Sequence, residues 1–135
     1  MLSAVTDVMV LGDVLGLEGL GALFVEPSGG EAPLASRVCA EITRLAPTPP
    51  LVIVAAGPLA SLVPSIALAQ RAARRQVLAY VLIDPEYPAV SEGWPDARVH
   101  VLGSPEFDLH IAELRGWETC PVTELRDLIV EIAFL

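Results

Sequence analysis

Several acidic residues come directly after apolar stretches that we expect to form strands. These residues are Glu26, Asp84, Glu86, Glu106 and Asp108. The carboxyl ends of parallel strands form one edge of a sheet, and open α/β sheets bind their ligands at that edge. Carboxylates that face one crevice repel each other, which raises the pKa of at least one of them and suits it to general acid or base chemistry. Glu26, Asp84, Glu106 and Asp108 are therefore candidate catalytic residues; the alternative is that they only cap helices and solvate loops.

The turn at Gly57 is a second candidate site, because it joins the apolar run 51–55 to a helical pattern. A sharp turn from a buried strand into a helix is where many α/β enzymes hold a nucleophile. Here the turn reads Ala55-Ala56-Gly57-Pro58-Leu59 and contains no Ser, Cys or Asp. Glycine can adopt the strained backbone of such a turn because it has no Cβ. The pattern therefore predicts either a nucleophile turn without its nucleophile or an ordinary strand-to-helix turn.

Three aromatic residues, Tyr87, Trp94 and Trp117, lie in loops that we expect near the same edge of the sheet. They could line an apolar ligand pocket beside Gly57, or they could cover the core. Neither role is fixed by the sequence.

The other reactive side chains form no catalytic or metal-binding set. His100 lies within a strand pattern, and His110 is close in sequence to Asp108. Cys39 and Cys120 are far apart, and no spacing of His, Cys and carboxylates matches a metal site. We expect no metal ion.

A nucleotide cofactor is not expected either. Gly29-Gly30 follows a strand pattern and could bind a phosphate at a helix N-terminus. It lacks the glycine-rich and Gly-Lys-Ser/Thr signatures, and Glu26 and Glu31 flank it with the wrong charge.

Composition limits the class of protein. A length of 135 residues suits one domain, 1–135. Hydrophobic residues make up 53% of the chain but aromatic residues only 5%, so Ala, Val, Leu and Ile must build the core. The net charge of −9 argues against binding to nucleic acid. All eight basic residues are arginines, as a GC-rich bacterial coding bias would produce. We found no signal peptide and no membrane-spanning stretch, so we expect a cytoplasmic protein.

Strand and helix patterns alternate along the chain. Strands are expected at 5–11, 22–26, 51–55, 77–83 and 98–102, with a glycine-rich link between the first two. Helices are expected at 34–45, at 59–75 with Pro64 either in the first turn or at a kink, at 109–114, and from Pro121 onward. This order predicts an α/β fold: a single three-layer domain with a mainly parallel sheet of about five strands and right-handed crossovers.

The order of these segments resembles the α/β-hydrolase family, especially its thioesterase branch, in a truncated form. "LFVEPSGGEAPLASRVCAEITRL" is similar to the oxyanion strand and loop, and "PLVIVAAGPLASLVPSIALAQRA" to the nucleophile strand, turn and helix. "VLAYVLIDPEYP" and "ARVHVLGSPEFD" resemble the two following strands, and "RGWETCPVTELRDLIVEIAFL" the histidine loop and last helix. The similarity covers most of the chain, although each motif is degenerate.

Carried over onto this sequence, the resemblance implies that most of the catalytic residues are missing. Gly57 stands at the position of the nucleophilic Ser, and Trp117 at that of the catalytic His. The triad acid has a counterpart in Glu106 or Asp108. Glu26 takes the place of an oxyanion-loop His, where a carboxylate would repel the developing negative charge. Serine-hydrolase chemistry is therefore not expected.

Two functions, and a third, unrelated interpretation, fit these observations. The first is a catalytically degenerate, non-hydrolytic protein that binds an acyl or apolar ligand or a protein partner, in a biosynthetic pathway. The second is a non-hydrolytic enzyme, an isomerase or cyclase, that uses carboxylates in an apolar crevice. The third is an unrelated flavodoxin-like or Rossmann-like module.

We also expect self-association. In the reduced family order, the helix at 34–45 would join two neighbouring strands, and it would lie on the same face as the helix at 59–75. Only the final helix would then cover the opposite face, which would leave an apolar patch exposed. A homodimer, or a complex with a pathway protein, is the expected consequence.

Overall fold

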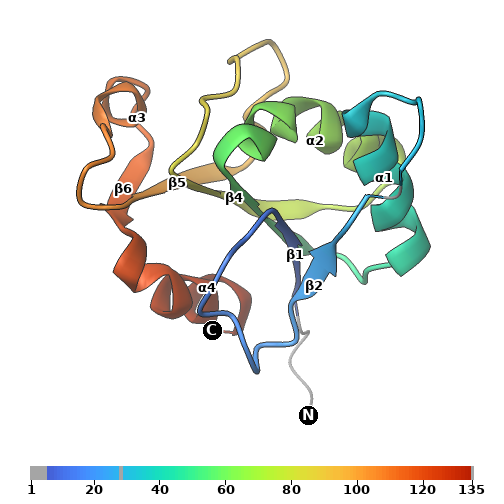
Figure 1. Ribbon diagram of the computed structural model, residues 1–135, viewed down its shortest axis with the longest axis horizontal. Coiled ribbons are helices and arrows are strands. Elements are labelled where there is room, and N and C mark those ends of the chain that lie inside the picture. Colours follow the sequence, from blue (N-terminus) through green and yellow to red (C-terminus); the bar gives the residue numbers. More distant parts are fainter. Residues whose placement is uncertain (1–5, 28, 135) are drawn as a thin grey trace.

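The sheet of this protein has six strands, all parallel. The computed structural model describes residues 6–27 and 29–134. The strands lie in the order β2-β1-β3-β4-β5-β6 (Figure 1). Their bounds are β1 Asp7–Leu11, β2 Leu23–Val25, β3 Leu51–Ala56, β4 Val77–Ile83, β5 Arg98–Gly103 and β6 Glu118–Pro121. Val5, where the first strand was expected to begin, and Ser28 of the expected turn after the second strand lie outside the described residues.

Helices lie on both faces of this sheet and complete three layers. The α-helices are α1 Leu34–Leu45, α2 Val63–Ala72, α3 His110–Leu114 and α4 Leu125–Phe134, and short 3₁₀ helices span Gly57–Leu62 and Val122–Glu124. Figure 1 shows α1, α2 and α3 on one face and α4 on the other. The predicted single-domain α/β fold with a parallel sheet is confirmed. Of the two placements expected for Pro64, the structure shows the first: it lies in the first turn of α2.

The central strands are buried because helices or loops cover both of their faces. Residues Leu51 to Ala55 of β3 are all 0% exposed, which explains why the sequence there is a continuous apolar run rather than an alternating one. The side chains divide into two buried clusters, one on each face. Val38 of α1 and Ile66 of α2 belong to the first cluster, and Ile129 of α4 belongs to the second.

Strand β1 lies between β2 and β3, which corrects the expected order. Met9 of β1 pairs with Leu23 of β2 on one side and with Ile53 of β3 on the other. The strands joined by α1 are therefore not neighbours, because the crossover passes over β1. The sequence reasoning omitted β1 when it placed that helix.

The face under α4 is not bare. The link at 12–22, between β1 and β2, crosses this face and buries Leu17, which is 2% exposed. Val14 and Leu20 of the same link pack against the same cluster. The strand residues on this face are 0–1% exposed at the five central positions, Val8, Val10, Val52, Val54 and Val81. The expected patch fails to form because the link acts as a second covering layer.

Strand β6 was not expected. It has four residues, Glu118–Pro121, and pairs only with β5. Because β6 lies between Trp117 and the final helix, Trp117 precedes the last strand instead of following it.

Within the described part of the chain, no helix has the length and apolarity needed to cross a bilayer.

Candidate functional site

The connections that follow β1 and β3 lead in opposite directions along the sheet. From β1 the chain passes over the α4 face to β2, whereas from β3 it passes over the other face to β4. The two connections leave the sheet on opposite sides, so the topological switch point of the sheet lies between the carboxyl ends of β1 and β3. In open α/β sheets, that position is where ligands bind.

Gly57 lies on the β3 side of this switch point, directly after the strand. Its φ is 57°, a left-handed conformation that favours glycine, as the sequence predicted for this turn. A Cβ built on Gly57 would meet no atom within 4 Å, so the position faces open space. Its carbonyl oxygen accepts a hydrogen bond from the Glu86 backbone N–H at 3.0 Å, which fixes the turn against the loop after β4.

Gly12 lies on the β1 side and is packed much more closely. A Cβ on Gly12 would lie 3.4 Å from both Ala56 Cβ and Leu59 Cδ1, and its φ is 94°. A larger residue would therefore be strained and would push against the Gly57 turn. Glycine at this position lets the two strand ends approach each other.

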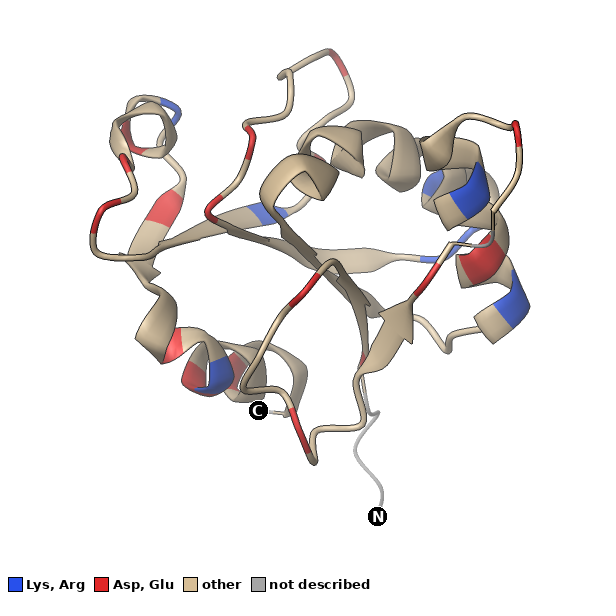
Figure 2. Ribbon diagram, in the orientation of Figure 1, with Lys and Arg blue, Asp and Glu red and all other residues tan. Residues whose placement is uncertain are grey.

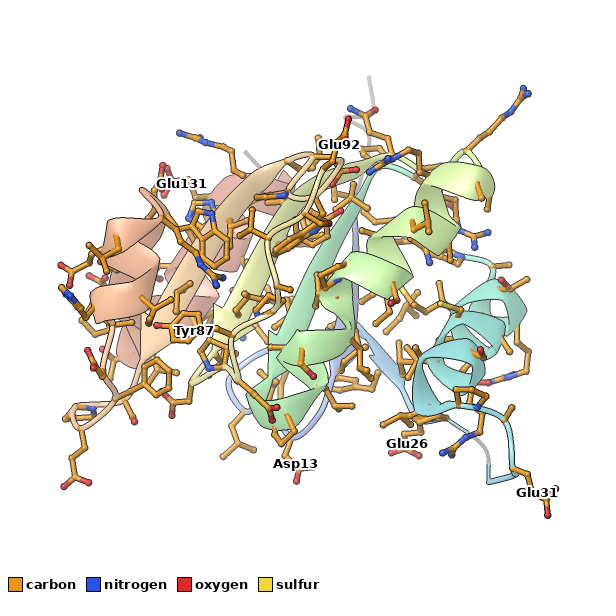
Figure 3. The ribbon with its side chains drawn as sticks, turned by 90° about the horizontal axis from the view of Figure 1, so that it is seen from above. Asp13, Glu26, Glu31, Tyr87, Glu92 and Glu131 are labelled. Atoms are coloured by element: carbon orange, nitrogen blue, oxygen red, sulfur yellow. The ribbon has the colours of Figure 1, made fainter. Side chains whose placement is uncertain are left out.

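An apolar groove begins at this point and extends over the end of β2. Its volume is about 580 Å³, and we call it the β1–β2 groove. Most of its walls are aliphatic or aromatic, and two carboxylates join them; the lining residues are Val10, Gly12, Asp13, Val14, Leu15, Phe24, Val25, Glu26, Pro27 and Leu59. Figure 3 shows Asp13 and Glu26 at the same edge of the molecule.

A second groove of about 590 Å³ lies at the carboxyl ends of β5 and β6, and we call it the β5–β6 groove. It is lined by apolar and hydroxyl side chains without a charged group among the described residues: Gly103, Ser104, Pro105, Phe107, Leu109, Thr119, Cys120, Pro121, Val122 and Thr123.

The four candidate acids do not converge. Glu26 follows β2 and Asp84 follows β4, which are three strand spacings apart, or about 14 Å. Glu106 and Asp108 follow β5 and are exposed. Of these four residues, the structure places only Glu26 in the β1–β2 groove.

Asp84 connects two strand ends. Its carboxylate Oδ1 accepts a hydrogen bond from the Ser104 backbone N–H at 2.8 Å, and its own N–H donates to the Leu102 carbonyl at 3.0 Å. It also adopts a φ of 41°, which is unusual for a residue with a Cβ. These contacts give Asp84 a structural role between β4 and β5.

Asp108 and Tyr87 order the segment before α3. The Asp108 carboxylate accepts a hydrogen bond from the His110 backbone N–H at 2.9 Å, and the Tyr87 hydroxyl donates to the Asp108 carbonyl at 3.1 Å. The Tyr87 ring lies 6.0 Å from that of Phe107. Both residues therefore stabilise the loop beside the β5–β6 groove, and neither lines the β1–β2 groove.

Trp94 and Trp117 lie away from the ligand edge, contrary to expectation. Trp94 is 3% exposed, and its ring contacts those of Tyr80 at 5.5 Å and Trp117 at 5.8 Å. Trp117 precedes β6, so it is at the amino end of that strand, and the Arg115 guanidinium lies 4.8 Å from its ring centroid. These aromatic rings belong to the core.

His100 is a buried residue of β5 that pairs with Glu118 of β6, and its side chain lies on the α4 side of the sheet. Its Nδ1 lies 3.1 Å from a carboxylate oxygen of Glu118. Burial lowers the pKa of His100, and Glu118 opposes that effect only in part. No group of three or more His, Cys, Asp or Glu residues in the described chain is arranged to hold a metal ion.

The two cysteines are not activated nucleophiles. Burial raises the pKa of the Cys39 thiol, and burial together with Glu124 and Glu118 raises that of Cys120. Both side chains therefore favour the neutral thiol over the reactive thiolate.

Sequence reasoning missed Asp13 as a site residue. It comes two residues after the end of β1, in the same relation to its strand as the acids that were singled out. The signal was present, but the residue was treated as part of a glycine-rich connector. Leu15 and Phe24 were missed because nothing in the sequence shows that β2 pairs with β1 as a parallel neighbour.

Comparison with known proteins gives no relative: no family model, curated protein or solved structure matches this chain. The class that the structure defines is an α/β domain with a six-stranded, all-parallel sheet and interspersed helices.

Proposed function

We propose that this protein is a non-hydrolytic, hydrolase-like binding protein that holds an apolar ligand at the carboxyl edge of its sheet. The observation that carries the proposal is the β1–β2 groove, which is largely apolar and includes Leu59, two residues after Gly57, in its wall. Its volume of about 580 Å³ is within the range of small-molecule sites.

The chemistry of the edge supports binding over acyl transfer. A serine-type mechanism needs a nucleophile, a base within reach and donors for the oxyanion. Gly57 offers no side chain, and neither His100 nor His110 lines either groove. Because β1 is the strand next to β3, the loop beside the turn is Gly12-Asp13 and not the segment after Glu26. Asp13 would repel an oxyanion as strongly as Glu26 was expected to.

A second candidate is the non-hydrolytic enzyme, an isomerase or cyclase. The observation in its favour is that Asp13 and Glu26 lie in an apolar groove, where a carboxylate could take a proton from a bound substrate. Binding is the simpler proposal, because both carboxylates are exposed to solvent.

Binding of the neutral fluorescent dye Nile red tests the proposal. Leu15 lines the groove and is 86% exposed, so changing it should leave the fold intact. We expect Leu15→Gln to weaken dye binding about threefold, through lost apolar contact. Leu114→Gln is the matched control, because Leu114 is 71% exposed on α3 and lines neither groove. Equal affinity in the Leu15→Gln variant and the unaltered protein would refute the proposal.

A further inference from the structure

Two carboxylates in the β1–β2 groove have no partner among the residues that the structure describes. Neither Asp13 nor Glu26 makes a hydrogen bond or an ion pair with any described residue. By contrast, Asp84, Asp96 and Asp108 each accept hydrogen bonds that fix their loops. The fold therefore makes no use of the two charges in the groove.

The arginines do not neutralise this groove. None of the eight lines it, and Figure 2 shows that the charged residues on the link between β1 and β2 are all acidic. Arg126 reaches the link from α4, but its Nη1 donates to the carbonyl oxygens of Gly16 at 3.0 Å and Glu18 at 2.7 Å. The groove thus combines apolar walls with uncompensated negative charge.

These two properties select among the ligands that the apolar walls alone would admit. A fatty carboxylate would fit the walls, but Asp13 and Glu26 would repel its head group. A neutral chain would gain only apolar contact. A chain or ring that carries a protonated amine would gain the apolar contact and the attraction of both carboxylates.

A second copy of this chain is a poorer occupant. The cations that could meet the groove lie at the end of α2 and the start of β5, on Arg71, Arg74, Arg75 and Arg98. Placing that region of one molecule on the groove of another makes a head-to-tail contact, which propagates into open chains unless its rotation closes a ring. A small molecule meets no such constraint.

We propose that the β1–β2 groove binds a small organic cation, an alkyl or aryl group that bears a protonated amine. This rests on the proposed function, since it names the class of ligand for the same groove. Asp13 and Glu26 bind the ammonium group, and the side chains around Val14, Phe24 and Leu59 hold the apolar part.

Three probes with one chain length test this assignment: octylammonium, octanol and octanoate, each titrated into the full chain and followed by NMR shifts of the groove residues. We expect octylammonium to bind about three- to tenfold more tightly than octanol, which is what two exposed carboxylates can contribute, and octanoate to bind most weakly. Added salt should reduce the preference because it screens exposed charges.

The variant Asp13→Asn with Glu26→Gln should remove the preference for octylammonium over octanol. Glu106→Gln with Asp108→Asn changes the net charge equally at the same edge, outside the groove, and should keep the preference.

If octylammonium and octanol bind equally, the cation assignment is wrong while the apolar site stands. If none of the three probes shifts the groove residues, the proposed function fails as well. Equal loss in both double variants would mean that overall charge, and not this groove, attracts the amine.

Discussion

At Gly57 the backbone has the positive φ of a strained turn, with open space where a side chain would project. We predict that the unaltered protein releases only background amounts of product from p-nitrophenyl esters and acyl thioesters, and that Gly57→Ser does the same. A serine there would have no base, because His100 is held at Glu118 on the α4 side and His110 begins α3. The substitution should also cost about 1 kcal/mol of folding free energy, because a Cβ is strained at this φ.

Labelling by a serine-directed fluorophosphonate provides the control for that prediction. Neither protein should be labelled. Turnover that persists through purification and disappears on labelling would contradict the prediction, because it would show that the protein has a serine nucleophile elsewhere.

His100 should make the stability of the protein depend on pH. Its pKa is lowered in the folded state because burial disfavours the charged ring, and Glu118, Arg98 and Glu131 act on it as well. The unfolded chain then binds more protons than the folded one as pH falls through the ordinary value of 6.5, so the free energy of unfolding decreases there. Below the folded-state pKa the loss levels off.

Urea unfolding at several values between about pH 5 and 8 measures this effect. His100→Gln should flatten the pH dependence relative to the unaltered protein, whereas His110→Gln, on the exposed residue at the start of α3, should leave it as it was. The same slope in His100→Gln as in the parent would rule out His100 as the source.

Among the elements, those with a long apolar run or a clear periodicity could be predicted, and those with neither could not. The apolar runs of β3, β4 and β5 are long and buried, and the expected ranges match them within one residue. β6 was missed because Glu118, Thr119, Cys120 and Pro121 form neither an apolar run nor a clear alternation at the edge of the sheet. That single omission displaced Trp117 from the end of the last strand to its beginning.

The candidate site was predicted only in part, for a related reason. Local rules identified the Gly57 turn and placed acids after strands, because both follow from short stretches of sequence. Which acids share a groove depends on strand order, and no local pattern encodes the insertion of β1 between β2 and β3. Glu26 consequently has Asp13 as its neighbour in the groove, and not Asp84 or Asp108.

The link between β1 and β2 should behave as part of the core, although it contains no helix or strand. Leu17 is 2% exposed and packs under the sheet on the α4 side, whereas Leu15 of the same link is 86% exposed. We predict that Leu17→Ala lowers the free energy of unfolding by about 2–3 kcal/mol. Leu15→Ala is the matched control and should change it by less than about 0.5 kcal/mol. Similar urea midpoints for both variants would mean that the link does not cover the sheet in solution.

For the whole molecule, self-association stays a prediction, but its structural reason has changed. The face under α4 is covered, so the open edges of the sheet remain as contact surfaces. β6 carries Glu118 and Pro121, a charge and an imino acid of the kind that protects edge strands from pairing. β2 carries neither, and Phe24 at its centre is 48% exposed. Pairing of β2 with its copy across a two-fold axis would therefore form a closed dimer.

Light scattering at micromolar concentration, without added ligand, tests this pairing. We expect a mass of twice 14.3 kDa for the unaltered chain. Phe24→Lys should return it to one chain, because two lysines would face each other across the axis at the centre of the edge. Ile111→Lys is the control, since Ile111 is 40% exposed on α3, which packs beside β6 at the opposite end of the sheet from β2, and should leave the dimer intact. A concentration-independent mass of 14.3 kDa for the unaltered chain would show that the three residues of β2 are too short an edge to associate.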